Sequence, residues 1–232
     1  MANIREIQTR INSVKDTMKI TNAMYMISST KMRQAKKKLA ESEPYFYGLQ
    51  GEISRILRHM PEIEHLYFDK REEIPKEKRK IGSIVITADK GLAGAYNHNI
   101  VKVEDELLKE PGEHKLFVVG ELGRHYYANK GVKIDTNFLY TVQKPTMHRA
   151  RDIAEEIFSQ FREGELDEVY IVYTRMENSM LTMVEKMKIL PLERSSFNEM
   201  KMPINIHREA IALYPSAEAV LDSRSEEHTS EL

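Results

Sequence analysis

The chain has 232 residues, of which 41% are hydrophobic and 31% are charged, and its formal net charge is −1. This length allows one or two domains with a packed core. The absence of cysteine excludes disulfides, thiol catalysis and cysteine zinc sites, and fits a reducing compartment. There is no run of about eighteen apolar residues and no signal or transit segment, so we expect neither a membrane span nor export.

The first sixty residues repeat apolar side chains in one heptad register. With Ile4 at position a, fourteen of the 17 a and d positions up to Met60 are apolar or aromatic; the exceptions are Thr21, Ser28 and Ser42. A 3.5-residue repeat of this length predicts a shaft helix over residues 1–61, wound against another helix. At about 1.5 Å per residue it would be roughly 85 Å long. Its coiled-coil seam begins with Ile4, Ile7, Ile11, Val14 and Met18.

Local signals set the ends of this helix. Asn3, followed three residues later by Glu6, predicts an N-cap and a capping box. Pro44 predicts a kink after which the helix resumes, because proline lacks a backbone donor and clashes with the preceding turn. Pro61 predicts the end of the helix.

The small net charge hides an uneven distribution. Residues 1–40 carry nine Lys or Arg against two acidic residues, a net charge of +7, and the rest of the chain carries about −8. A basic run is most often a solvated helix face; the alternative is a surface that contacts an acidic partner. Met24 and Met26 lie outside the seam, so we expect them to meet something other than the partner helix.

Beyond the helix the pattern changes twice. Residues 62–80 are charged and polar around Pro75, which predicts a linker. Residues 81–192 alternate β-branched runs with helical segments, which predicts a Rossmann-like α/β domain with a mostly parallel sheet. We expect strands at 81–87, 115–120, 132–139, 168–175 and 180–190, the last two as an antiparallel hairpin, and helices at 97–109, 121–130 and 146–162.

The sequence offers no set of residues that could carry chemistry. Gly91 and Gly94 follow the first strand but are spaced G-x-x-G, which favours a tight turn over a nucleotide site. The eight histidines lack metal-ligand spacing. Asp167 and Glu168 stand at a strand start, where carboxylates are ordinarily solvated. We therefore expect no catalytic residue, no cofactor and no metal.

Two segments carry a resemblance. Met18-Lys19-Ile20-Thr21-Asn22-Ala23-Met24-Tyr25-Met26 and the residues up to Ala35 resemble the N-terminal signature of the gamma subunit of F-type ATP synthase. Thr87-Ala88-Asp89-Lys90-Gly91-Leu92-Ala93-Gly94-Ala95-Tyr96-Asn97 is similar to the S/T-D-x-G-L-C/A-G-x-x-N loop of that family. The resemblance extends in order from residue 2 to about 222.

This resemblance implies a rotor subunit without chemistry of its own. The first helix would pair with a C-terminal helix as the central shaft, which couples proton flow through Fo to ATP synthesis or hydrolysis at the beta subunits by rotation. The implied partners are the alpha and beta subunits of the ring, the epsilon subunit and the c-ring, at the cytoplasmic face of a bacterial plasma membrane. The residues implied to contact the ring are Met18, Lys19, Met24, Met26, Lys31, Arg33, Lys36, Asp89, Lys90 and Gly91.

The end of the chain departs from the family pattern. Residues 193–222 are expected to form a connector and the start of the C-terminal helix, with Ser216 as its cap. The last nine residues, 224–232, resemble a translated adapter oligonucleotide, and residues 223–232 are set apart from the fold. We therefore expect a truncated chain whose last ten residues are non-native and lie outside the fold.

Two other functions remain open at this point. A basic coiled-coil protein could hold nucleic acid or another acidic partner through residues 1–40. A small nucleotide-dependent α/β enzyme is the other alternative, although the sequence supplies neither a phosphate-binding loop nor an acid–base pair.

Overall fold

The computed structural model describes residues 4–71, 73–178, 181–198 and 216–231. The chain divides into two compact units, Met1–Gly48 and Leu49–Leu232. Helix α1 (Ile4–His59) continues through Pro44 and ends before Pro61, as the sequence predicts. The predicted cap, Asn3, lies outside the described residues.

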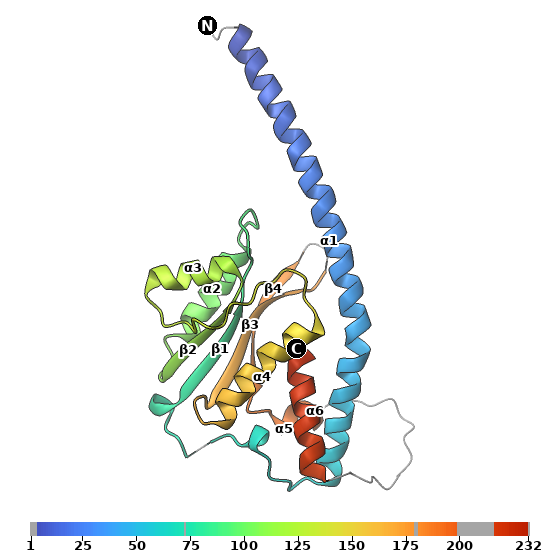
Figure 1. The fold of residues 1–232 in the computed structure, drawn as a ribbon, viewed down its shortest axis with the longest axis vertical. Helices are drawn as coiled ribbons and strands as arrows, with labels where there is room; N and C mark the ends of the chain where they lie inside the picture. Colours follow the sequence, from blue (N-terminus) through green and yellow to red (C-terminus); the bar gives the residue numbers. More distant parts are fainter. Residues whose placement is uncertain (1–3, 72, 179–180, 199–215, 232) are drawn as a thin grey trace. The chain divides into compact units, whose positions relative to one another are not determined.

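A four-stranded sheet in the order β2-β1-β3-β4 is the centre of the second unit (Figure 1). Strand β1 (Lys80–Ile86) pairs in parallel with β2 (Glu113–Val119) and with β3 (Glu168–Met176). Strand β4 (Thr182–Leu190) is antiparallel to β3. The predicted α/β class, with a mostly parallel sheet and a final hairpin, is confirmed.

Helices cover both faces of this sheet. Helices α2 (Tyr96–Leu107) and α3 (Glu121–Lys130) pack on one face. On the other face lie α4 (Met147–Arg162) and α6 (Ala217–Glu231), together with the last turns of α1. Successive strand residues such as Ile84 and Val85 therefore enter two different cores, which is why β1 is buried almost throughout.

Short-range chemistry explains the helix boundaries. Gly131 ends α3 with φ +73°, a left-handed conformation that glycine adopts without strain. The Thr146 hydroxyl accepts a hydrogen bond from the Arg149 N–H (3.3 Å) and caps the start of α4. Both boundaries agree with the sequence prediction.

One predicted strand is wrong. Residues 132–139 make only an isolated bridge, Ile134 to Leu116, and otherwise follow an irregular path. The Asp135 carboxylate accepts the Asn137 N–H (2.9 Å) and pairs with Lys115 (3.1 Å), so it stabilises a turn where a strand was expected.

The end of α1 is built into the core of the second unit. Leu49, Ile53 and Ile56 occupy consecutive d, a and d positions of the heptad register, and all three are buried. Leu57 is buried beside them, and the same cluster contains Leu221 of α6. This part of the predicted seam is therefore covered within the second unit.

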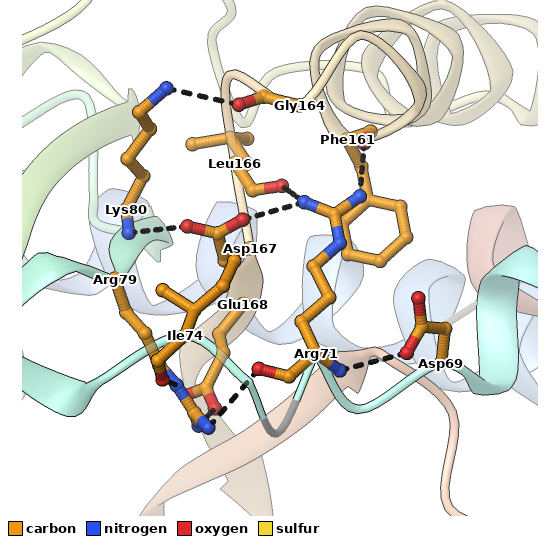
Figure 2. Close-up of polar contacts among 10 residues, drawn as sticks. All are labelled: Asp69, Arg71, Ile74, Arg79, Lys80, Phe161, Gly164, Leu166, Asp167 and Glu168. Atoms are coloured by element: carbon orange, nitrogen blue, oxygen red, sulfur yellow. Dashed lines mark hydrogen bonds and ion pairs between the residues drawn. The ribbon is translucent and has the colours of Figure 1, made fainter.

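The predicted linker is structured over residues 62–71 and 73–80, which are called the strap below. It contains two short 3₁₀ helices, Leu66–Phe68 and Lys76–Lys78. The Arg71 guanidinium donates to the Asp167 carboxylate (2.7 Å) and to the Phe161 carbonyl (2.7 Å), and lies 4.2 Å over the Phe161 ring (Figure 2). Asp167 also accepts the Lys80 N–H (2.9 Å).

A second ion pair lies next to the first. Arg79 donates to Glu168 (2.5 Å), which also accepts Lys188 (3.0 Å) and the Tyr170 hydroxyl (2.9 Å). Asp167 and Glu168 are only 5% and 7% exposed, so the expectation that they are solvated is wrong. They are buried because two arginines of the strap neutralise them.

Burial alone would raise the pKa of Glu168. Its hydrogen bonds from Lys188 and Tyr170, with the charges of Lys188 and Arg79, outweigh that effect and hold the pKa below its usual value. The ionised carboxylate is thus the form that the folded state favours.

The C-terminal segment differs from expectation. After the short helix α5 (Arg194–Asn198), α6 begins with the Ser216 hydroxyl accepting the Ala219 N–H (3.2 Å), as predicted, but it continues through residues 223–231. Its buried face is apolar at Ala217 and Leu221, and then polar at Ser225, His228 and Thr229. The non-native origin of residues 223–232 stays a prediction.

Candidate protein-contact surfaces

The first surface is the apolar stripe of α1 within the first unit. All five residues predicted to begin the seam are exposed, from 45% for Ile11 to 81% for Ile4. Large apolar side chains exposed at heptad spacing are unfavourable in water, and a patch of this kind favours contact with another protein. The sequence-predicted seam residues therefore share one helix and one exposed stripe.

The basic residues of α1 surround the C-terminal part of this stripe. Lys31, Arg33 and Lys36 are all exposed. Two ion pairs within the helix, Lys19 with Asp16 (3.0 Å) and Lys37 with Glu41 (3.8 Å), leave the segment strongly positive. Exposed pairs of this kind contribute about 0.5 kcal/mol or less, so they do not fix the lysines in place.

Three methionines precede Lys31 along α1. Met18 occupies the seam, whereas Met24 and Met26 lie outside it, and all three are exposed, Met26 by 70%. Methionine is flexible and polarisable, so it adapts to a surface that changes. The three methionines and the basic residues are thus available on the same stretch of helix.

The second surface is the loop between β1 and α2. Asp89 does not point outward: its Oδ1 accepts the N–H groups of Glu121 (3.3 Å) and Val142 (3.4 Å). Asn97 Oδ1 accepts the Ala88 N–H (2.9 Å) and closes the loop from its other end. Asp89 is therefore an anchor of the loop, and these two side chains hold its ends to the domain.

The tip of this loop is open to solvent. Lys90 and Gly91 are exposed, as is Leu92, which is 92% exposed and has φ +65°. A leucine in the left-handed region is strained, and an apolar side chain gains nothing from full exposure. Leu92, an exposed apolar residue between two turn glycines, is therefore a further candidate contact residue of this loop.

The described residues offer little for chemistry. Among residues 4–71, 73–178, 181–198 and 216–231, no group of three or more His, Cys, Asp or Glu side chains could hold a metal ion. In the same ranges, no helix combines the length and hydropathy needed to cross a bilayer.

Known sequences match nearly the whole chain. The family model described as ATP synthase matches residues 3–231. The ATP synthase gamma chain of Caldanaerobacter subterraneus subsp. tengcongensis is 41% identical over 83% of this chain, and that of Acetivibrio thermocellus is 40% identical over 91%. The matched region covers 65% and 70% of these two relatives, so it spans just under two thirds of the length of the first.

A solved structure has a similar fold. The central stalk and c-ring structure of the Tetrahymena thermophila mitochondrial ATP synthase contains a chain that matches with a TM-score of 0.56. The match covers 91% of this chain and 96% of that one, at 21% sequence identity. Identity at this level supports the fold alone, that is, a long first helix and an α/β domain.

Proposed function

Since this chain belongs to the ATP synthase family, among the gamma chains, we propose that it is the central rotor-stalk subunit of the F1 sector. In this role it couples proton flow through Fo to ATP synthesis or hydrolysis at the beta subunits by rotation. The relatives give no support to the alternative of a nucleic-acid-binding coiled coil.

The observation that carries this proposal is the exposed stripe on α1. A shaft needs apolar side chains at heptad spacing to hold its partner helix, and Ile4, Ile7, Ile11 and Val14 supply them without cover within the first unit. At about 1.5–3 kcal/mol for each large side chain that becomes fully buried, a partner would stabilise this stripe strongly. A helix that binds no partner would leave this apolar stripe exposed to water.

The ring of alpha and beta subunits is the proposed partner of the basic segment. Met18, Lys19, Met24, Met26, Lys31, Arg33 and Lys36 would lie against acidic loops of the ring. Exposed ion pairs are worth about 0–1 kcal/mol each, so contacts of this strength can form and break as the shaft turns. Flexible methionines suit a surface whose neighbours change during rotation.

The loop after β1 is proposed as a further ring contact. Lys90 and Gly91 stay in that role, Leu92 joins them because of its exposure, and Asp89 acts by holding the loop in shape. The proposed remaining partners are the epsilon subunit and the c-ring. The subunit carries no catalytic site of its own and sits peripherally at the cytoplasmic face of a bacterial plasma membrane.

Co-purification with ring subunits tests this function. The chain is co-expressed with tagged alpha and beta subunits of Acetivibrio thermocellus, whose gamma chain is 40% identical, and the complex is isolated by size-exclusion chromatography. We expect the chain to elute with the ring. The triple variant Lys31→Glu, Arg33→Glu, Lys36→Glu should be retained less, because like charges would then oppose an acidic ring.

The matched control reverses charge elsewhere. Lys102→Glu and Lys109→Glu alter exposed lysines at α2, away from the proposed contact residues, and should leave co-elution unchanged. Absence of the unmodified chain from the ring fraction would overturn the proposed function. Equal retention of the triple variant and the control would overturn the role of the basic segment alone.

A further inference from the structure

One carboxyl group is buried in the α/β domain without a charge partner. Glu104 lies on α2 and has no exposed surface, although it shares the buried face of that helix with Ile100, Val101 and Leu107. Neither of its carboxyl oxygens has a hydrogen-bond partner among the residues that the structure describes. Burial of an ionised carboxylate in such surroundings is strongly unfavourable.

Two buried hydroxyl groups belong to the same core. Ser83 on β1 and Tyr127 on α3 are both fully buried, and their oxygens have no hydrogen-bond partner within the described ranges. Tyr127 packs in the same apolar cluster as Ile100 and Val101, which share the buried face of α2 with Glu104. Burial, followed by the charge of Glu104, raises the pKa of the Tyr127 phenol. Helix α2, strand β1 and helix α3 thus each place in one apolar core a polar group that has no hydrogen-bond partner among the described residues.

The charged groups around Glu104 form ion pairs with each other. Asp105 pairs with Lys130 (2.6 Å), and Lys186 of β4 pairs with Glu110 (2.9 Å). Within the described part of the chain, Glu104 takes part in no ion pair. A neutral carboxylic acid, in contrast, can both donate and accept a hydrogen bond, and the hydroxyls of Ser83 and Tyr127 are the available partners.

We propose that Glu104 is a proton-binding site of the α/β domain, held as a neutral acid next to the hydroxyls of Ser83 and Tyr127, whose ionisation loosens α2 from the sheet. Helix α2 begins at Tyr96, directly after the loop whose tip is Leu92. Loss of the proton therefore changes the mobility of that loop as well as the packing of the helix. The ligand of this site is the proton itself.

The titration behaviour agrees with this geometry. Burial raises the pKa of Glu104 to about 7; the Ser83 hydroxyl and Lys186 act in the lowering direction, and Asp105 and Glu110 in the raising direction. The unfolded chain releases this proton near pH 4.3, so between about pH 4.3 and 7 the folded chain binds more protons. The stability from this site is complete below that window and is lost as the pH rises through it.

Urea unfolding of the full chain at several pH values tests the proposal. From pH 5 to 7, the unfolding constant of the unmodified chain should rise relative to that of Glu104→Gln by about 40-fold in total. Glu106→Gln is the matched control, because it makes the same change at an exposed position of the same helix, and it should follow the unmodified chain. Parallel pH dependence of the unmodified chain and Glu104→Gln would overturn the proposal.

Infrared spectroscopy observes the proton directly. The unmodified chain should show the carbonyl stretch of a buried, protonated carboxyl group at pH 6 and lose it by pH 8.5, while amide hydrogen exchange in α2 accelerates. Glu104→Leu should lack this band, and it replaces the glutamine variant if that variant does not fold. Persistence of the band in Glu104→Leu, or its absence from the unmodified chain at pH 6, would overturn the assignment.

Discussion

The guanidinium of Arg71 lies 2.7 Å from the carboxylate of Asp167, a residue 96 positions further along the chain. This pair fastens the strap after α1 to the start of β3. Both side chains are nearly buried, so each depends on the other for neutralisation.

Replacement of Arg71 by Ala should lower the free energy of unfolding by about 3 kcal/mol, because it leaves the Asp167 carboxylate buried without its cation. Urea unfolding measures this loss. Lys37→Ala removes the cation of an exposed pair and should cost about 0.5 kcal/mol or less. Equal losses for the two variants would contradict the structural role of Arg71.

Acid should weaken the fold through Glu168. Because its pKa is lowered in the folded state, its stabilising contribution is present above the pKa of the unfolded chain and is lost as the pH falls through the folded value. Glu168→Gln should therefore be less stable than the unmodified chain at neutral pH, and the difference should shrink on acidification. Chemical unfolding between pH 2 and 7 checks this, and a difference that does not change with pH would contradict it.

Gly120→Ala should destabilise the domain by about 2 kcal/mol or more. Gly120 has φ +101°, and a Cβ there would stand 2.2 Å from the Thr87 carbonyl oxygen, which belongs to a neighbouring strand end. Gly91→Ala is the control, because nothing lies within 4 Å of its added Cβ. Thermal unfolding compares the two; a neutral Gly120→Ala would mean that the close approach of these backbones is not maintained.

Ser225→Ala should raise the free energy of unfolding by about 1 kcal/mol, because it removes a buried hydroxyl and places a better helix former in α6. The Ser225 oxygen has no hydrogen-bond partner among the described residues. Ser223→Ala makes the same change at an exposed position of α6 and should gain less. A loss of stability in Ser225→Ala would show that the hydroxyl has a partner.

Leu92→Gly should raise the stability of the domain and weaken its binding to the alpha and beta ring. Glycine relieves the positive φ, so the domain should gain about 1 kcal/mol, while affinity for the alpha and beta ring should fall because an exposed apolar contact is lost. Thermal unfolding and the co-elution experiment measure the two effects. Simultaneous loss of stability and binding would argue that Leu92 supports the fold.

Periodicity and turn chemistry predicted most elements, since a heptad repeat, a Gly131 cap or a Thr146 cap acts through neighbours in sequence. The burial of Asp167 and Glu168 could not be predicted in this way. Their partners, Arg71 and Arg79, lie 96 and 89 positions away, and only the sheet brings them together. The failed strand at 132–139 shows the same limit, because strand formation depends on a partner edge rather than on local propensity.

The candidate contact surfaces, too, were only partly predictable from the sequence. The seam at Ile4–Met18 and the basic residues were visible in the sequence, because spacing and charge are properties of a helix by itself. The inward turn of Asp89 was not, since it depends on the Glu121 and Val142 backbones that anchor the loop. Whether Met18, Lys31 and Lys90 contact a ring stays a prediction.

The burial of Leu49, Ile53 and Ile56 gives α1 a mechanical property. A helix whose last turns are seated in a close-packed core cannot slip about its own axis relative to that core. These side chains therefore hold the last turns of α1 in a fixed rotational position relative to the sheet. Under the proposed rotor function, the strength of this packing would set the largest torque that the domain and the end of the helix can exchange.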